Sequence, residues 1–176
     1  MPGNHEKAKH IRVLILDVDG ILTSGKIFYQ EQGHQILGFH IHDGLGIKLL
    51  QKAGIEVAVI SGRQSEALTR RLSELNIRLA YLGQEDKRPA YNEIRHKLQL
   101  EDQAMAYMGD DLPDLPLLTR AGFAISVPSA PAVIRQHVDL ITHQQAGDGA
   151  VREACDFIMN AQDLYQPMVQ SYLSNP

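Results

Sequence analysis

The sequence predicts an α/β fold in three layers, with a parallel central sheet between two layers of helices. Short aliphatic and β-branched runs alternate along the chain with stretches in which apolar residues recur at helical spacing, which is typical of such sheets. One strand-like hairpin interrupts the alternation after the first strand. The chain has 176 residues, 44% of them hydrophobic, so it can bury one core and we expect a single domain over residues 1–176.

The expected strands follow from short apolar runs, and the expected helices from apolar residues that recur at helical spacing. Apolar and β-branched runs predict strands at residues 11–16, 55–60, 79–82, 104–108, 123–127 and 138–141. Between them, apolar residues at helical spacing predict helices, marked by Leu45, Leu49, Leu50 and Ala53, by Leu68, Leu72 and Leu75, and by Tyr91, Ile94 and Leu98. Gly54 and Asn76 follow the first two of these stretches, where a residue that tolerates a left-handed backbone ends a helix.

Two segments depart from the alternation. Residues 26–29 and 35–41 are strand-like and predict a β-hairpin over 26–41 that leaves the carboxyl end of the first strand. Such a hairpin could lean over a site at that end of the sheet. Residues 163–176 mix apolar and polar side chains without a strong period, and we expect a tail that needs a neighbour to become ordered.

The composition argues against several classes of protein. Seventeen Lys and Arg against 21 Asp and Glu give a formal net charge of −4, which does not favour nucleic acid as a partner. The longest apolar runs have four to five residues, far fewer than the roughly 18 that span a bilayer. The N-terminal residues are polar and show no secretory signal, so we expect a cytoplasmic protein without a membrane partner. Cys155, the single cysteine, is expected to be a small side chain of the core.

Polar and charged groups follow four of the predicted strands, at the point where each strand ends. In chain order they are Asp17-Val18-Asp19-Gly20, Ser61-Gly62-Arg63, Lys87, and Gly109-Asp110-Asp111 with Asp114. Taken one at a time, each has an ordinary explanation as a turn, a helix cap or a solvated lysine. Because the carboxyl ends of parallel strands meet at one edge of a sheet, the four groups together predict a single pocket there.

The residue types in this pocket indicate phosphoryl chemistry assisted by Mg²⁺. Clustered carboxylates suit a hard cation that takes oxygen ligands and often keeps a substrate phosphate in its shell. Lys87 and the hydroxyl and N–H groups of Ser61 and Gly62 suit the remaining phosphate oxygens. His40 and His42 could suggest a separate metal site, but neither a cysteine nor a third histidine at ligand spacing accompanies them, and we reject that interpretation.

In order and in residue type, the four motifs resemble those of the haloacid dehalogenase superfamily of phosphatases, over nearly the whole chain. The resemblance implies a Rossmann-like fold in which the hairpin stands in place of a cap domain, with Mg²⁺ as the cofactor. It also implies that Asp17 is the nucleophile, that Asp19 is the general acid and then the base, and that Lys87 neutralises the phosphoryl oxygens.

The same resemblance implies the ligands of the metal. They are the side chains of Asp17 and Asp110 and the backbone carbonyl of Asp19. Asp111 and Asp114 would orient Lys87 or metal-bound water. A receiver-like signalling domain also combines strand-end aspartates with a hydroxyl and a lysine, but an order that begins with Asp17-x-Asp19 favours a hydrolase.

Further segments resemble a narrower, cap-less branch of the superfamily. They are the hairpin, Asp43-Gly44-Leu45-Gly46, Ser61-Gly62-Arg63 and residues 147–153. That branch acts on an acidic sugar phosphate in lipopolysaccharide synthesis and assembles tetramers through its hairpins, with C-terminal tails that reach adjacent sites. The resemblance therefore implies an acidic sugar phosphate as substrate and a homotetramer in which residues 163–176 contribute to the neighbouring site.

Substrate recognition is left open between alternatives. Arg63 follows the phosphate turn and could bind a sugar carboxylate with its planar guanidinium. It could equally be an ordinary surface arginine on a helix. Among phosphatases, the nearest alternative to the cap-less branch is an enzyme for a sugar phosphate of the sialate 9-phosphate type. The sequence hardly separates these two kinds of phosphatase.

Overall fold

The computed structural model describes residues 2–31 and 35–174 of the chain. Its strands are β1 (Val13–Leu16), β2 (Phe28–Tyr29), β3 (Gln35–Ile36), β4 (Glu56–Ser61), β5 (Leu79–Leu82), β6 (Met105–Met108), β7 (Phe123–Ser126) and β8 (Leu140–Ile141). Its helices are α1 (Pro2–Ala8), α2 (Ile41–Lys52), α3 (Glu66–Glu74), α4 (Arg88–Leu98), α5 (Leu115–Leu118), α6 (Ala132–Arg135), α7 (Ala150–Ala161) and α8 (Tyr165–Leu173), with the turns η1 (Val18–Leu22), η2 (Asp102–Ala104) and η3 (Leu112–Asp114).

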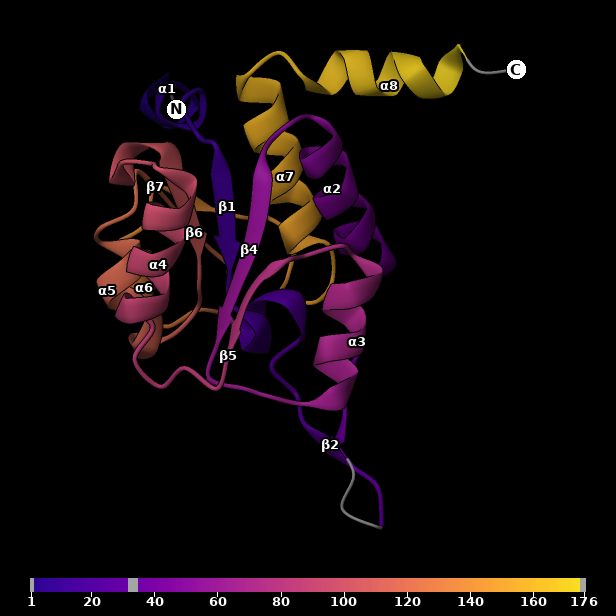
Figure 1. The fold of residues 1–176 in the computed structure, drawn as a ribbon, viewed down its shortest axis with the longest axis vertical. Coiled ribbons are helices and arrows are strands. Elements are labelled where there is room, and N and C mark those ends of the chain that lie inside the picture. Colours follow the sequence, from indigo (N-terminus) through magenta and orange to yellow (C-terminus); the bar gives the residue numbers. More distant parts are fainter. Residues whose placement is uncertain (1, 32–34, 175–176) are drawn as a thin grey trace.

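A parallel sheet separates two layers of helices, which confirms the predicted α/β class. Figure 1 shows the sheet nearly edge-on, with α2, α3 and α7 on one side and α4, α5 and α6 on the other. The strand order is β5-β4-β1-β6-β7-β8, and every neighbouring pair is parallel. After β1, the chain forms β4 and β5 on one side of β1, and then returns to form β6, β7 and β8 on the other side. The order therefore reverses at β1, and ligands of such sheets bind outside the carboxyl ends of the strands at this point.

Strand β1 lies at the centre of the sheet because its side chains are apolar on both faces. All four of its residues are fully buried, as expected of a parallel strand covered by helices on either side. Its last residue, Leu16, is paired with Val59 of β4 and with Met108 of β6. This register brings the residues that follow Leu16, Val59 and Met108 to the same edge of the sheet, which is where the predicted site residues lie.

The helix ends follow the predicted stop residues, but the ordinary explanation of the group at Ser61 as a helix cap does not hold. Gly54 and Asn76 have φ values of 85° and 56°, so both adopt the left-handed backbone expected after α2 and α3. Helix α3 begins after Ser65, whose Oγ accepts a hydrogen bond from the N–H of Leu68 at 3.2 Å. The turn at Ser61 therefore precedes a short loop, and Ser61 does not cap a helix.

The hairpin is shorter than predicted. Strands β2 and β3 have two residues each, and Gln32, Gly33 and His34 lie outside the described residues. The expectation that residues 35–41 form one strand is wrong beyond Ile36, because α2 already begins at Ile41. The first turn of α2 is fixed by Asp43, whose carboxylate accepts the N–H groups of Gly149 and Arg152 at the start of α7.

The described part of the chain begins and ends with helices that the sequence did not predict. Helix α1 was not foreseen, and the expected unordered tail instead contains α8, where Tyr165 and Met168 pack partly against the core. Figure 1 shows α8 at the opposite end of the molecule from the hairpin. Cys155 is fully buried, as predicted. No helix in the described ranges is long and apolar enough to cross a membrane.

Candidate active site

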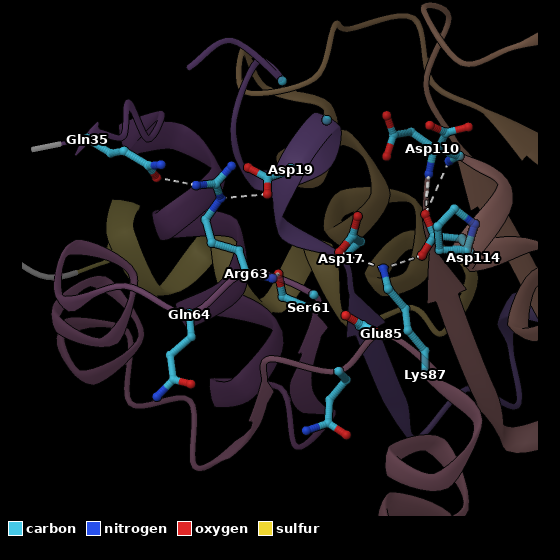
Figure 2. Close-up of a pocket in the computed structure, with 16 residues that line it drawn as sticks. Asp17, Asp19, Gln35, Ser61, Arg63, Gln64, Glu85, Lys87, Asp110 and Asp114 are labelled. Atoms are coloured by element: carbon cyan, nitrogen blue, oxygen red, sulfur yellow. Dashed lines mark hydrogen bonds and ion pairs between the residues drawn. The ribbon is translucent and has the colours of Figure 1, made fainter. Parts of the chain in front are cut away.

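A polar cavity of about 780 Å³ lies at the carboxyl end of the sheet. All of the residues singled out as site residues from the sequence line it, and they are Asp17, Asp19, Ser61, Gly62, Arg63, Lys87, Asp110, Asp111 and Asp114. Figure 2 labels most of these side chains and shows them converging from the ends of β1, β4 and β6 and from the start of α4. The structure therefore brings the four predicted groups into one pocket, as the parallel topology requires.

Lys87 lies between two carboxylates at the centre of this pocket (Figure 2). Its Nζ is 2.8 Å from Oδ1 of Asp17 and 2.6 Å from Oδ1 of Asp114. The lysine side chain is only 5% exposed, so it is not the solvated lysine of the ordinary explanation. Burial works against its charge, but the two carboxylates outweigh burial and hold the pKa of Lys87 above its usual range. The side chain is therefore an ammonium ion that points at the predicted nucleophile.

Asp114 holds this arrangement together because it accepts hydrogen bonds at both oxygens. Oδ1 accepts from Lys87 and from the hydroxyl of Tyr107, each at 2.6 Å. Oδ2 accepts from the N–H groups of Asp110 and Asp111 at 3.0 and 3.2 Å. Asp114 thus positions Lys87 and the loop that carries Asp110. Sequence reasoning missed Tyr107, although a tyrosine inside a buried strand needs a partner for its hydroxyl group.

Asp111 caps the turn that follows β6. Its side chain accepts the N–H of Leu112 at 2.8 Å and forms a capping box with Asp114 at the start of η3. No hydrogen bond or ion pair of the described residues joins it to Lys87, so of the two expected roles only the orientation of metal-bound water stays a prediction for Asp111. Asp111 stabilises the turn that places Asp110 and Asp114.

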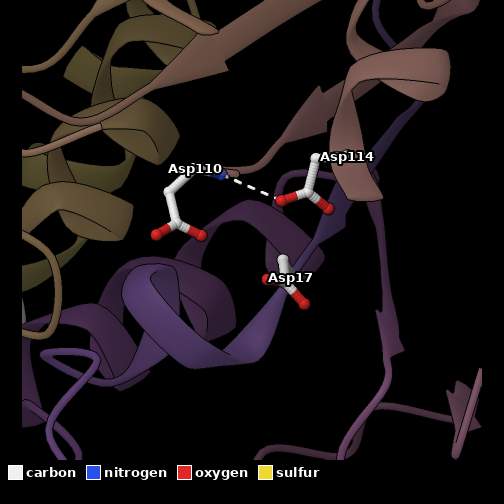
Figure 3. A group of neighbouring side chains, drawn as sticks. All are labelled: Asp17, Asp110 and Asp114. Carbon is white, nitrogen blue, oxygen red and sulfur yellow. Dashed lines mark hydrogen bonds between the residues drawn. The ribbon is translucent and has the colours of Figure 1, made fainter. Parts of the chain in front are cut away.

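Three carboxylates gather where a cation could bind. Oxygens of Asp17, Asp110 and Asp114 lie within 4.8 Å of one another. Figure 3 shows the three side chains as neighbours. Since both oxygens of Asp114 already accept hydrogen bonds, Asp17 and Asp110 are the carboxylates left to hold the ion. The backbone at Gly20 also approaches Asp110 so closely that a Cβ there would overlap its carboxylate. This set of oxygen donors fits a hard divalent cation.

The charges at this cluster are not balanced by the protein alone. Burial and the nearby Asp114 raise the pKa of Asp17 to about 6, even though Lys87 opposes the shift. Burial and the charge of Asp17 raise the pKa of Asp110 to about 7. Both carboxyl groups therefore bind protons more readily than usual, which is expected where further positive charge is needed.

Replacing Gly20 by alanine is expected to weaken cation binding by at least about tenfold. Gly20 has a φ of +80°, and a methyl group there would push the Asp110 carboxylate away from Asp17. Gly54→Ala is the matched control, because Gly54 has a φ of +85° but nothing within 4 Å of its Cβ position. Calorimetric titration with a divalent cation would measure both variants, and equal affinities would contradict the predicted overlap.

Arg63 is not an ordinary surface side chain. Its Nε lies 2.6 Å from Oδ2 of Asp19, and its Nη1 donates to Oε1 of Gln35 in the hairpin (Figure 2). Its backbone N–H donates to Oγ of Ser61 at 3.0 Å. The surface interpretation of Arg63 is therefore wrong, while its binding of a substrate carboxylate stays a prediction. Sequence reasoning missed Gln35, because nothing in a two-residue strand marks a polar side chain as a member of a distant site.

Comparison with known proteins identifies the family of the chain. A model of the haloacid dehalogenase-like hydrolases matches residues 81–153. The chain is 40% identical to the 3-deoxy-D-manno-octulosonate 8-phosphate phosphatase of Yersinia pestis, over 90% of this chain and 84% of that relative. Its identity to the corresponding phosphatase of Haemophilus influenzae is 41%, over 89% of this chain and 87% of that relative.

Solved structures agree with the sequence relatives. The phosphatase from Moraxella catarrhalis, crystallised with a magnesium ion, a phosphate ion and a 3-deoxy-D-manno-octulosonate (KDO) molecule, matches with a TM-score of 0.95 and 42% identity. That match covers 98% of this chain and 99% of the other. A cobalt-bound form of the Haemophilus influenzae enzyme matches with a TM-score of 0.91 and 39% identity, over 96% of this chain and 99% of the other. The chain is therefore a phosphatase of the haloacid dehalogenase superfamily and belongs to the family of 3-deoxy-D-manno-octulosonate 8-phosphate phosphatases.

Proposed function

We propose that the protein hydrolyses 3-deoxy-D-manno-octulosonate 8-phosphate to KDO and phosphate, with Mg²⁺ and through an aspartyl-phosphate on Asp17. The observation that carries this proposal is the buried Lys87, which lies between Asp17 and Asp114 in a cavity large enough for a sugar phosphate. The relatives named for this reaction support the choice of substrate. We place the reaction in the cytoplasm, as a step of lipopolysaccharide synthesis.

In the first step, a carboxylate oxygen of Asp17 attacks the phosphorus atom, and the bond from phosphorus to the sugar oxygen breaks. Lys87 holds Oδ1 of Asp17 at 2.8 Å, so the second oxygen can form the new bond. Asp19, acting as the general acid, gives its proton to the departing sugar oxygen. The products of this step are KDO, carrying that proton, and an aspartyl-phosphate.

In the second step, water attacks the phosphorus of the aspartyl-phosphate. Asp19 now takes a proton from this water, and the bond between phosphorus and Asp17 breaks to release phosphate. One side chain thus serves as acid and then as base, so both steps need Asp19 close to the reacting phosphoryl group.

Phosphoryl transfer from an anion to a carboxylate requires positive charge around the phosphoryl oxygens. Lys87 provides one charge, and the hydroxyl of the buried Ser61 and nearby backbone N–H groups provide hydrogen-bond donors. Mg²⁺, held by Asp17, Asp110 and the carbonyl of Asp19, would supply further positive charge to the phosphoryl oxygens when bound. Asp114 already holds the Lys87 ammonium group at 2.6 Å, so the lysine needs little reorganisation during the reaction.

The proposed substrate is tested by measuring phosphate release from KDO 8-phosphate beside a panel of other sugar phosphates, with Mg²⁺ or with EDTA. Selective, Mg²⁺-dependent release from KDO 8-phosphate is expected. Release from a nine-carbon sugar of the sialate 9-phosphate type instead would replace the substrate and keep the mechanism. No release from any compound in the presence of Mg²⁺ would contradict the proposed function and favour a signalling role.

We expect Mg²⁺ to raise the unfolding midpoint more at about pH 8 than at about pH 5. A carboxyl group whose pKa is raised by folding favours the folded state below its unfolded pKa, and this contribution is lost as the pH rises through the folded pKa. For Asp17 and Asp110 that window ends near 6 and 7. Above it the metal-free site carries excess negative charge, which Mg²⁺ neutralises. Thermal unfolding with Mg²⁺ or EDTA measures the effect, and equal stabilisation at both pH values would contradict it.

We further propose a homotetramer, in which the tail 163–176 contributes to a neighbouring site. Large apolar side chains are exposed on the hairpin and on α8, and they are Ile27, Phe28, Tyr29, Ile36, Tyr172 and Leu173. Apolar side chains gathered on projecting elements favour contact with other copies of the chain. A monomer in sedimentation velocity at full specific activity would contradict the tetramer.

A further inference from the structure

The side chain of Asp19 is paired with Arg63 and is not part of the carboxylate cluster. Its Oδ2 accepts a hydrogen bond from Nε of Arg63 at 2.6 Å. Among the described residues, the cluster that could hold a cation contains Asp17, Asp110 and Asp114. In Figure 2 the Asp19 carboxylate points toward Arg63, while Asp17 points toward Lys87. The proposed acid and base is therefore held by an arginine on one side of the cavity.

Arg63 is anchored from three directions. Its backbone N–H is tied to Ser61, its Nη1 donates to Gln35 in the hairpin, and its Nε donates to Asp19. The Arg63 side chain is 14% exposed, whereas that of Asp19 is 39% exposed. A charge-assisted hydrogen bond with this geometry favours one orientation of both side chains. Of the two, Asp19 is the side chain with room to move, and Arg63 is the fixed partner.

A substrate that carries its own carboxylate would compete for the same guanidinium. A guanidinium binds a carboxylate through parallel N–H groups, and Asp19 and Gln35 already use two nitrogens of Arg63. A phosphate ester without a carboxylate offers nothing to displace Asp19. With a substrate that has no carboxylate, Asp19 therefore stays paired with Arg63. With an acidic substrate, Asp19 can leave Arg63. Asp17 is the nucleophile in both cases.

We propose that Arg63 acts as a latch on Asp19, which the carboxylate of an acidic sugar phosphate releases by taking over the guanidinium. This inference rests on the proposed function, because it requires an acidic substrate. The released Asp19 carboxylate, which is 39% exposed, takes up a proton from solvent, turns toward the phosphoryl group and gives that proton to the departing sugar oxygen. Arg63 is then a positioning and specificity residue, since it makes general acid catalysis depend on the substrate carboxylate.

The test compares two phosphate esters without a carboxylate that differ in their leaving group. The leaving group of β-glycerol phosphate is an alkoxide, which must be protonated as it departs. The leaving group of 4-nitrophenyl phosphate is a stable phenolate, which needs little help from a general acid. Arg63→Ala frees Asp19, so the ratio of kcat/KM for the alkyl ester to that for the aryl ester is expected to rise roughly fivefold. In the same variant, kcat/KM for KDO 8-phosphate is expected to fall roughly 100-fold.

Two further variants make the result specific. Arg63→Gln keeps a long polar side chain without charge and should raise the same ratio, which covers the case in which Arg63→Ala does not fold. Arg70→Ala removes an arginine of α3 that is 83% exposed and lies outside the cavity, and it should change neither the ratio nor the rate with KDO 8-phosphate.

The outcomes distinguish a failure of the proposed latch from a failure of the proposed substrate. A ratio that stays constant or falls in both Arg63 variants would overturn the latch, even if KDO 8-phosphate hydrolysis is lost, because Arg63 would then only bind the sugar or support the fold. If wild-type protein does not hydrolyse KDO 8-phosphate, the proposed substrate fails, and the alkyl-to-aryl ratio still tests whether Arg63 restrains Asp19.

Discussion

Asp17→Asn is expected to lower phosphate release by roughly 10⁴-fold or more. Asparagine has nearly the shape of aspartate, and its amide oxygen can still accept a hydrogen bond from Lys87, which lies 2.8 Å from Oδ1 of Asp17. An amide cannot attack phosphorus to form a stable acyl phosphate, so the first bond is not made. Steady-state phosphate release from KDO 8-phosphate, with substrate binding measured separately, would show the expected loss in kcat.

The same substitution is expected to leave the metal-free fold intact or to stabilise it. Folding raises the pKa of Asp17 from 3.8 to about 6, so above that pH its charge opposes folding by an amount on the order of 3 kcal/mol. Asparagine removes this charge. A catalytic side chain that costs stability in the resting protein is common in active sites.

Asp148→Asn is the matched control for this variant, because Asp148 is 73% exposed and lies outside the active-site cavity. It makes the same chemical change and should keep nearly full activity. Appreciable steady-state turnover by Asp17→Asn would contradict the covalent mechanism. A variant that is inactive because it is unfolded would instead show a lowered unfolding midpoint with EDTA present.

The sheet and the position of the site could be predicted from the sequence because both depend on local patterns. The buried run Val13–Leu16 is apolar at every position, which marks a central parallel strand. Once parallel order is assumed, the residues after each strand must meet at one edge. Asp17, Ser61, Lys87 and Asp110 were therefore brought together correctly without any knowledge of their contacts.

The contacts within the site could not be predicted, since they join residues far apart in the chain. Arg63 and Asp19 are 44 positions apart, and Lys87 and Asp114 are 27 positions apart. Spacing indicates which residues reach the edge of the sheet, but it does not indicate which carboxylate each cation binds. For this reason the sequence left Arg63 open between a surface position and substrate binding, and did not indicate that Arg63 is paired with Asp19.

The segments that were predicted incorrectly depend on packing against distant elements. Ile41 begins α2 because Asp43 is bonded to the start of α7, more than 100 positions later in the chain. Helix α8 has no fully buried residue, so its sequence lacks the clear apolar stripe of a core helix. Local spacing is a weak guide in both places, because the stabilising partners are outside the segment.

Lys87→Met is expected to destabilise the protein by roughly 3 kcal/mol at about pH 8 and to lower activity by at least roughly 10³-fold. Methionine fills much of the same volume, but it leaves the buried Asp17 and Asp114 facing each other without a counter-charge. The stability loss should shrink toward pH 5, because Asp17, whose pKa is raised to about 6, can then bind a proton. Denaturant unfolding at the two pH values would measure this difference.

Adding Asp114→Asn to Lys87→Met should restore most of the stability and none of the activity. With the lysine absent, the asparagine oxygen can accept the N–H groups of Asp110 and Asp111, and its NH₂ group can donate to the hydroxyl oxygen of Tyr107. In Asp114→Asn alone, the oxygen can serve Lys87 or the backbone N–H groups but not both, so that single variant is also destabilised.

A double-mutant cycle in unfolding free energy therefore has an expected coupling of roughly 2 kcal/mol or more between Lys87 and Asp114. Additive effects would contradict the account of Asp114 as the residue that positions the lysine. Recovery of activity in the double variant would contradict the role of the Lys87 charge in phosphoryl transfer. A stable but inactive double variant is the expected result, because the fold requires that the buried charges balance, whereas the reaction requires positive charge beside Asp17.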